Sequence, residues 1–468
     1  MHPVLLKTDM LFFVLLGALS AYVLYARRHQ HLCAPWRQVA RQPLGMAAAV
    51  VLCSYLLVAI LDSIHFRAAL PTSNETGAVY SRDLTSVFDV LVSPLRTNVE
   101  RTYSAPFAAE AYAKEVVELA DGSNARAYPR LEHGGAHLRD PASERGADIG
   151  ARLIGGIALG SALTIAIGVI TVTGCARSVG RAWTATALSM LRGADAVPWR
   201  SIFGTIGLLL LLLGCAIELS PYYHVFGTDQ VGNDVLYQAL KSIRTGLLIG
   251  TLTTLVMLPF ALALGLAAGY FGGWIDDAIQ YFYTTLSSIP GVLLVAASAL
   301  MLEVYMSRHG DSYASLAARA DLRLLALCMI LGVTNWTGLC RYLRGEALKL
   351  RSVEFVEAAR AFGVSDSRIL QRHILPNIMH IVMISIVLDF SGLVLAEAVL
   401  TYIDIGVDPS MESWGNMING ARLELAREPV VWWSLCAAFG LMFVLVLAAN
   451  IFADAVRDAF DPRLRSTE

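Results

Sequence analysis

Two carboxylates lie inside an apolar segment towards the C-terminal end of the chain. Asp389 and Glu397 both fall in residues 377–403, which are apolar enough to cross a membrane. A charge at mid-bilayer costs at least about 2.5–3.5 kcal/mol, so it normally faces a cavity or a partner. On a helix the two positions are about 80° apart, so one wide face can hold both. They therefore either line a translocation path and meet an ammonium group, or pair with donors at a subunit interface or near the membrane surface.

Motifs for covalent, metal-assisted or nucleotide chemistry are absent from the sequence. There is no G-x-x-x-x-G-K-[ST] loop, no H-E-x-x-H, no G-x-S-x-G and no paired cysteine motif. None of the seven cysteines lies in the polar stretch 62–149, which argues against a disulfide framework or a metal cluster. His224, His309 and His373 stand apart from one another and are interpreted as ordinary surface or interface histidines. The chain is expected to have no catalytic residue, no metal site and no bound cofactor.

The composition indicates an all-α integral membrane protein. Apolar residues make up 56% of the chain and charged residues only 16%, against about 25% in soluble domains. The net charge of −2 gives no argument for nucleic acid as a partner, whereas membrane lipid is one. About nine membrane-spanning helices are predicted, at residues 10–26, 43–61, 151–174, 201–218, 245–275, 285–302, 324–340, 377–403 and 430–453.

The basic loops set the expected orientation. Loops rich in Lys and Arg lie in the cytoplasm, and those around Arg41 and between residues 175 and 200 are of this kind. The N-terminus is then outside and the C-terminus is cytoplasmic. The turn after the fifth span should also be cytoplasmic, although it carries Asp276 and Asp277 and no basic residue.

Residues 62–149 form a polar insert, which the flanking loops place outside the cytoplasm. The insert is expected to be small and mainly helical. Its clearest helix would be capped by Ser104, with Pro106 in its first turn and Gly122 past its end. Apolar residues between positions 107 and 119 recur at helical spacing, which predicts one buried face.

Residues 341–377 form a strongly basic stretch between two spans. A helix is predicted from Gly345 to Phe362, with Phe355, Ala359 and Phe362 on one side, and Gly363 ends it. Ser365 can cap a second, shorter helix, and Pro376 opens the next span. A helix, a glycine turn and a helix make a stiff lever that could transmit a partner's motion to the membrane.

These residues also carry a resemblance. Glu357-Ala358-Ala359, Gly363 and the run from His373 to Asn377 together resemble the EAA loop of ABC importer permeases, of the dipeptide/oligopeptide (peptide/nickel) C-subunit type. In that family the loop is a coupling helix that seats in a cleft of the ATPase subunit. The resemblance implies that the ATPase-coupling residues are Glu357, Ala358, Ala359, Arg360, Gly363, Leu375 and Pro376.

Further motifs extend the resemblance from about residue 201 to the C-terminus. Residues 226–236 are similar to the family's FGTD…GRD signature on the outer side, although Asn233 stands where Arg or Lys is usual. Residues 269–276 are similar to its GYxGGxxD turn, 413–417 to its SWGxM element and 454–464 to its C-terminal ending. The outer-side signature residues are Gly227, Thr228, Asp229, Gly232 and Asp234.

The resemblance divides the chain into four parts. Residues 1–61 would hold two added transmembrane helices, 62–149 the extracytoplasmic insert and 150–200 a third added helix with a cytoplasmic loop. Residues 201–468 would form the six-helix permease core, with the coupling loop at 341–377.

The function implied is that of a permease subunit, not an enzyme, in the inner membrane of a prokaryote. Its expected partners are a homologous permease, two ATPase subunits that bind ATP-Mg, and an extracytoplasmic solute-binding protein. The cargo would be peptides or similar small solutes, with nickel or peptide antibiotics as alternatives.

Two other classes of function remain open. One is a proton-coupled secondary transporter that uses Asp389 and Glu397, although internal repeats and broken helices are not evident. The other is a sensor or scaffold that acts through residues 62–149. A milder version of the second is that the insert docks the binding protein or a further subunit.

Overall fold

The computed structural model describes residues 2–68, 80–81, 84–118, 124–309 and 315–460. The chain divides into two compact units. Unit 1 comprises residues 1–4, 37–245 and 412–448, and unit 2 comprises residues 5–36, 246–411 and 449–468. Each unit is a bundle of helices, which agrees with the predicted all-α membrane class.

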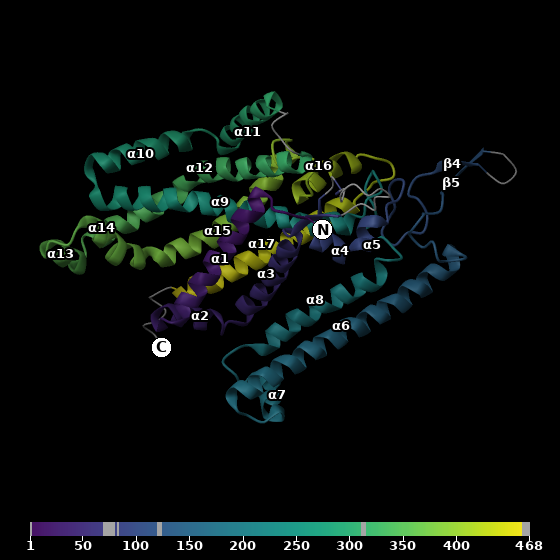
Figure 1. Cartoon of the computed structure of the whole chain (residues 1–468), viewed down its shortest axis with the longest axis horizontal. Helices are drawn as coiled ribbons and strands as arrows, with labels where there is room; N and C mark the ends of the chain where they lie inside the picture. The colour runs from purple at the N-terminus through teal and green to yellow at the C-terminus, as the bar shows by residue number, and fades with distance from the viewer. Residues whose placement is uncertain (1, 69–79, 82–83, 119–123, 310–314, 461–468) are drawn as a thin grey trace, which may run out of the picture. The chain divides into compact units, whose positions relative to one another are not determined.

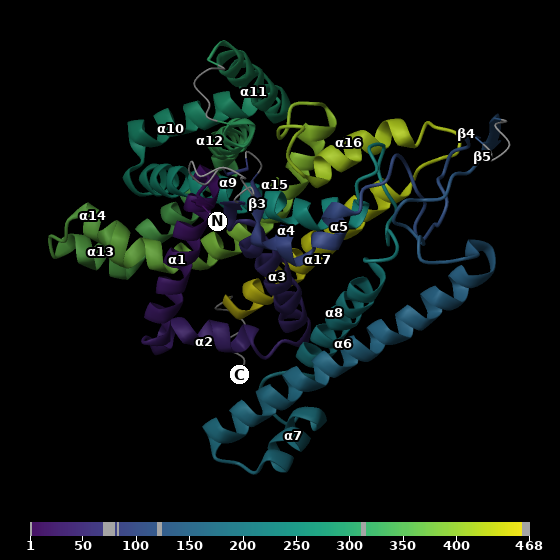
Figure 2. The same cartoon turned by 45° about the vertical axis from the view of Figure 1, so that its right-hand side comes forward.

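Unit 1 contains the insert and several long helices. Its elements are β1 (His2–Val4), α3 (Pro43–Asp62), β2 (His65–Arg67), β3 (Thr85–Ser86), α4 (Val87–Leu91), α5 (Ser93–Thr97), β4 (Glu115–Glu118), β5 (Asn124–Ala127), α6 (Pro141–Val179), α7 (Trp183–Arg192), α8 (Trp199–Leu219) and α16 (Trp414–Glu424). It also holds the first parts of α9 (Val235–Phe271) and α17 (Trp433–Phe460). Helices α6 and α8 lie side by side, with α7 at one end of the pair (Figures 1 and 2).

Small residues bring α6 and α8 into backbone contact. A Cβ at Gly156 would overlap the main chain of Cys215, and one at Gly214 would overlap that of Gly156. Lipid tails supply no hydrophobic drive between helices, so such close approach is a main source of helix association in membranes. Because α6 starts at Pro141, its first turns occupy residues that the sequence assigned to the insert.

The insert is built from strands, short helices and irregular chain, so the prediction of a mainly helical insert was wrong. Strands β1, β2 and β3 form one antiparallel sheet, and β4 and β5 form a separate hairpin. A capping box covers the N-terminus of helix α4: the side chains of Ser86 and Asp89 each accept a hydrogen bond from the other's backbone N–H.

The helix predicted after Ser104 does not form. Phe107 has a positive φ of 57°, and the N–H groups of Ala111 and Leu131 bond to the carbonyls of Pro129 and Ala109. Residues 115–118 are the strand β4, and the predicted stop at Gly122 lies outside the described residues. Ala109 and Ala111 are buried but Val116 is 63% exposed, so the helical spacing of apolar residues did not mark one buried face.

Unit 2 contains the helices that lead to and from the basic loop. They are α1 (Lys7–Arg27), α10 (Gly273–Ser288), α11 (Gly291–Arg308), α12 (Leu316–Arg351), α13 (Glu354–Ala361), α14 (Asp366–Ile369), the π-helical turn η2 (Leu370–Ile374) and α15 (Leu375–Tyr402), together with α9 from Gly246 onward. Helix α2 (Gln30–Val39) has most of its length here. One apolar core joins α9, α10, α12, α13, α14, η2 and α15 and includes Met257, Trp336, Leu343, Val356, Ile374 and Ile378.

Helices α9 and α12 approach each other closely along unit 2. A Cβ at Gly265 would lie 2.8 Å from the carbonyl oxygen of Cys340, and one at Gly269 would lie 2.6 Å from that of Arg344. The glycines thus allow contact between the two main chains, and this contact fixes the register of α9 against α12.

The added helix α1 is attached to α12 by one carboxylate. Asp321 accepts the backbone N–H groups of Lys7 and Thr8, at 2.8 and 3.4 Å, and the hydroxyl of Thr8. Asp321 and Thr8 are buried. These N–H groups have no partner within α1, so a side chain of α12 takes the place of a local N-cap.

Eight helices of the described chain are long and apolar enough to cross a membrane, against nine predicted. The difference lies at the predicted seventh span, 324–340, which is part of the long but less apolar helix α12. The predicted sixth span, 285–302, is divided between α10 and α11 at Ile289 and Pro290.

Replacing Asp321 with Ala should lower the Tm of the purified protein. The change leaves the buried N–H and hydroxyl of Thr8, and the partly buried N–H of Lys7, without an acceptor, which costs about 1–3 kcal/mol for each buried group. Thermal unfolding in detergent is the measurement. Asp321→Asn keeps one acceptor oxygen and should have a smaller effect. Equal Tm values for the Ala variant and the parent would contradict the attachment of α1 through this residue.

Candidate functional site

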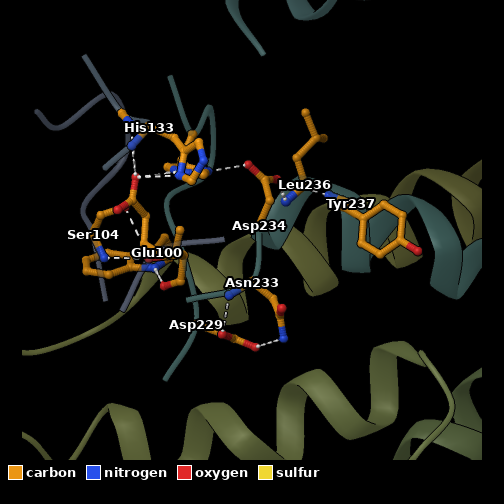
Figure 3. Close-up of polar contacts among 12 residues, drawn as sticks. Glu100, Ser104, His133, Asp229, Asn233, Asp234, Leu236 and Tyr237 are labelled. Carbon is orange, nitrogen blue, oxygen red and sulfur yellow. Dashed lines mark hydrogen bonds and ion pairs between the residues drawn. The ribbon is translucent and has the colours of Figure 1, made fainter. Parts of the chain in front are cut away.

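The outer-side signature forms a tight turn that leads into α9. Asp229 accepts the N–H groups of Val231 and Asn233 through Oδ1, at 2.9 and 2.8 Å, and Gln238 donates to its Oδ2 at 2.7 Å. Asp234 then accepts the N–H of Leu236 at 2.8 Å, in the first turn of α9 (Figure 3). Each carboxylate therefore orders backbone around the start of one long helix.

The insert packs directly on this turn. Gly232 has a φ of 86°, and a Cβ there would overlap the carbonyl of Glu100, whose N–H donates to the carbonyl of Gly232 at 3.0 Å. The Thr228 hydroxyl accepts the N–H of Ser104 at 2.6 Å. Glycine is therefore needed at position 232 for two reasons: the backbone there is left-handed, and a side chain would collide with the main chain of the insert.

A buried histidine lies between two carboxylates of this cluster. His224 Nδ1 is 2.8 Å from Asp234 Oδ2, and its Nε2 is 3.4 Å from Glu100 Oε1. The side chain is 3% exposed, so the interpretation of His224 as an ordinary surface or interface histidine was wrong. Figure 3 shows Glu100 and Asp234 pointing into the same polar cluster. We call Glu100, His224 and Asp234 the outer clamp.

Electrostatics favour the charged forms of His224 and Glu100. Burial opposes charge on His224, but Asp234 and Glu100 outweigh it and raise the pKa of His224 to about 9. Burial also opposes charge on Glu100, but hydrogen bonds from His224 and from three backbone N–H groups lower the pKa of Glu100 to about 2. Those N–H groups belong to Glu132, His133 and Gly134.

A second candidate site is the basic loop, whose helix–glycine–helix order agrees with the prediction. Helix α13 ends before Gly363, which has a φ of 75°, and α14 follows Ser365. The predicted single helix from Gly345 to Phe362 is instead two helices, because extended backbone at Val353 separates α12 from α13. Pro376 lies in the first turn of α15 and Leu375 packs on the core. We call residues 352–374 the elbow.

The apolar face predicted for the elbow was only partly right. Val356 and Ala359 are the buried residues of α13, whereas Phe355 is exposed and Phe362 is 88% exposed. The break at Val353 turns α13 so that Val356 enters the core. Glu357, Ala358, Arg360 and Gly363 lie on the exposed side of the elbow.

The end of α9 holds the elbow, and the start of α10 holds α12, the helix that leads into the elbow. Asp276 accepts two hydrogen bonds from Arg344 of α12, at 2.6 and 2.7 Å, and this partner lowers the pKa of Asp276. The hydroxyl of Tyr270 donates to Asp366 Oδ1 at 2.6 Å, and the Arg360 guanidinium lies 5.2 Å from the Tyr270 ring centroid.

Sequence reasoning identified this turn but not its partners. The pairing of Asp276 with Arg344 explains how an acidic turn can lie beside a basic loop, since each supplies the other's counter-charge. The signal available in the sequence was the excess of Arg in the loop.

The two acids of the apolar segment lie in α15, in different surroundings. Glu397 is 1% exposed and accepts the hydroxyl of Thr401 at 2.9 Å. Asp389 is only half-buried. The contact of Glu397 with its own helix favours a structural part for this residue, whereas a place for Asp389 on the translocation path stays a prediction.

The chain is similar to inner-membrane transport proteins. Residues 261–466 match the family described as "Binding-protein-dependent transport system inner membrane component". The oligopeptide transport system permease protein OppC of Mycobacterium tuberculosis (H37Rv) is 30% identical over 243 residues, which cover 52% of this chain and 77% of that protein. The dipeptide transport system permease protein DppC of Alkalihalophilus pseudofirmus is 32% identical, covering 52% and 73%.

Two further similarities complete this comparison. The glutathione transport system permease protein GsiD of Pectobacterium atrosepticum is 30% identical over 245 residues, covering 52% of this chain and 74% of that protein. A solved chain of the MetNI methionine ABC transporter in an inward-facing conformation covers 47% of this chain and 94% of its own length, with 15% identity and a TM-score of 0.34. That score is too low to support an argument on fold.

The outer clamp should give the protein a defined pH dependence. The stabilisation from His224 is complete below the histidine's usual pKa of 6.5 and is lost as pH rises through about 9. That from Glu100 is complete above its usual 4.5 and is lost as pH falls through about 2. His224→Gln should therefore lower the Tm most between about pH 4.5 and 6.5. The part of this Tm loss that comes from the histidine's charge should disappear as pH rises through about 9. His309→Gln, at an exposed position, is the control, and a Tm loss from His224→Gln that is the same at pH 6 and pH 10 would refute the assignment.

The adjacent acids Asp276 and Asp277 offer a matched pair of variants. Asp276→Asn removes the charge that Arg344 contacts and should cost about 1.5–3 kcal/mol, the range for hydrogen bonds to charged groups. Asp277→Asn, at an exposed position, should leave the Tm nearly unchanged. Thermal unfolding in detergent compares them, and equal effects of the two changes would disprove the fastening.

Proposed function

Because the chain belongs to the family of binding-protein-dependent transport system inner membrane components, we propose that it is a permease subunit of an ATP-driven importer of peptides. The peptide class is inferred from the relatives, whose names specify oligopeptide, dipeptide and glutathione transport. The chain forms half of a translocation pathway, and a homologous permease forms the other half. ATP-Mg binds to two separate ATPase subunits, since this sequence has no phosphate-binding loop.

The single observation that carries this proposal is the exposed elbow between two long helices. Phe362 stands almost fully exposed beside Gly363, with Glu357, Ala358 and Arg360 on the same exposed side. Phe355 is also exposed, and aromatic and Arg side chains are enriched in protein–protein interfaces. The partner proposed is the ATPase subunit.

The elbow is built to transmit motion rather than to absorb it. Helix α12, of 36 residues, ends where the elbow begins, and helix α15, of 28 residues, begins where the elbow ends. Val356 and Ile374 bury the elbow in the same core as these helices. Tyr270 of α9 donates to Asp366 of the elbow, and Asp276 of α10 holds α12 through Arg344. A shift of α13 on closure of the ATPase pair would therefore move the helices with it.

Unit 2 also supports the proposed orientation. Asp321, which holds the N-terminus of α1, and Arg351, which precedes the elbow, lie at opposite ends of α12, about 45 Å apart along the helix. An elbow in the cytoplasm then puts the N-terminus of α1 outside. The C-terminus is cytoplasmic in the same arrangement, and the membrane is the inner membrane of a prokaryote.

The outer clamp supports a part for the insert at the outer face. Glu100 and Ser104 contact the signature turn directly, so a solute-binding protein that approaches this turn also meets the insert. The insert would then contribute to docking of the binding protein.

Reversing one charge on the elbow should uncouple the transporter. Glu357→Lys, at an exposed position, should leave membrane insertion intact and ATP hydrolysis measurable while peptide uptake falls about tenfold or more, the equivalent of about 1.4 kcal/mol. Uptake and hydrolysis are measured in proteoliposomes that contain all the subunits. Glu346→Lys makes the same charge change on α12, outside the elbow, and should retain uptake. Normal uptake by Glu357→Lys would count against the ATPase contact.

A pull-down in mild detergent tests the assembly itself. Tagged chain should recover a second permease and ATPase subunits with phosphate-binding loops, identified by mass spectrometry. Recovery of the chain alone, or with unrelated proteins, would favour the alternative of a sensor or scaffold that acts through the insert.

A further inference from the structure

Three adjoining hollows form one groove along α11 and α12 of unit 2. The two larger ones have volumes of about 500 and 370 Å³ and share Ser298, Met329 and Ile330. The third is small and shares Leu302 and Ile330 with the larger of these two. Together they run from the start of α12 to Trp336, beside α10.

The small hollow is a charged head. It is lined by Arg319 and Arg323, one turn apart on α12, and by Glu303 of α11. The Arg323 guanidinium is 3.9 Å from both Glu303 and Asp408, so it is shared between two acids rather than held by one. The head thus carries two positive and two negative groups, which balance.

Two groups of the head are available to a ligand. Arg319 Nε is buried and has no hydrogen-bond partner in the part of the chain that the structure describes. A buried donor without an acceptor is costly, so a ligand acceptor there would be favourable. The Glu303 side chain is 50% exposed and only loosely paired.

The rest of the groove is apolar. Its walls include Phe282, Leu286, Met301, Leu325, Met329 and Trp336. Met and aromatic side chains accommodate varied apolar groups, because the thioether is flexible and the rings present broad surfaces. The volumes fall in the range of small-molecule sites, about 300–1,000 Å³.

We propose that this groove binds the C-terminal end of the transported peptide, with the terminal carboxylate on Arg319 and the apolar side chain of the last residue in the groove. The inference rests on the proposed function and goes beyond it, since it assigns recognition of peptide ends to this permease chain. A guanidinium and a carboxylate pair in a fork geometry, which gives Arg319 selectivity for a free C-terminus.

The test compares a free peptide with its C-terminal amide in the complete reconstituted transporter. Uptake of trileucine and trileucine amide is measured for the parent and for Arg319→Gln, with the same binding protein throughout. The ratio of free to amidated uptake should fall about tenfold in Arg319→Gln, the equivalent of one charge-assisted hydrogen bond. Because only the permease differs, a change in this ratio reports on the permease.

Two further variants complete the test. Arg308→Gln removes an exposed charge at the end of α11, outside the groove, and should keep the parent ratio. Met329→Trp fills the apolar part and should reduce trileucine uptake more than trialanine uptake. This second variant decides the matter if Arg319→Gln fails to assemble.

Other outcomes would overturn the inference. An unchanged ratio in Arg319→Gln together with equal effects of Met329→Trp on both peptides would do so. So would loss of a tightly bound phospholipid from Arg319→Gln in native mass spectrometry with the uptake ratio unchanged, which would make the groove a lipid site. If the parent imports neither peptide, the proposed function fails first, and this inference with it.

Discussion

The close contact between α9 and α12 is the constraint on which the rest of unit 2 depends. Gly265 and Gly269 let the two main chains touch, and this sets how far α9 runs past α12 before the chain turns. The turn then delivers Asp276 to Arg344 and Tyr270 to Asp366. A shift of α9 by one turn, about 5.4 Å, would separate both pairs. In a membrane, where helices gain little from apolar burial against each other, steric fit of this kind substitutes for the hydrophobic effect.

The sequence could predict the features that local chain chemistry determines. Gly363 ends a helix because of its own conformation, and Pro376 starts one because it lacks an N–H, so the order of the elbow was predictable. The long apolar helices followed from composition in the same way. The branch of permeases was predictable too, since its motifs lie at fixed spacing in the C-terminal half.

Features that depend on distant partners could not be predicted in this way. Asp234 and Glu100 together raise the pKa of His224, and Glu100 is 124 positions away from it in the chain. The supposed helix after Ser104 failed for the same reason, because Ala109 and Ala111 are buried by residues near position 130 rather than by each other. The orientation of α13 depends on the extended backbone at Val353, and no residue type at this position predicts a break in the helix.

The attachment of α1 to Asp321 has a consequence for biosynthesis. Thr8 and Asp321 are 313 positions apart, so α1 gains its acceptor only after the 313 residues that follow Thr8 have been made. At about 5–20 residues per second, this delay is roughly 15–60 s. During that time the N-terminal end of α1 has open backbone donors near the membrane surface, which water, lipid headgroups or the insertion machinery must satisfy. Helix α1 is therefore made well before the residue that completes its N-terminal hydrogen bonds.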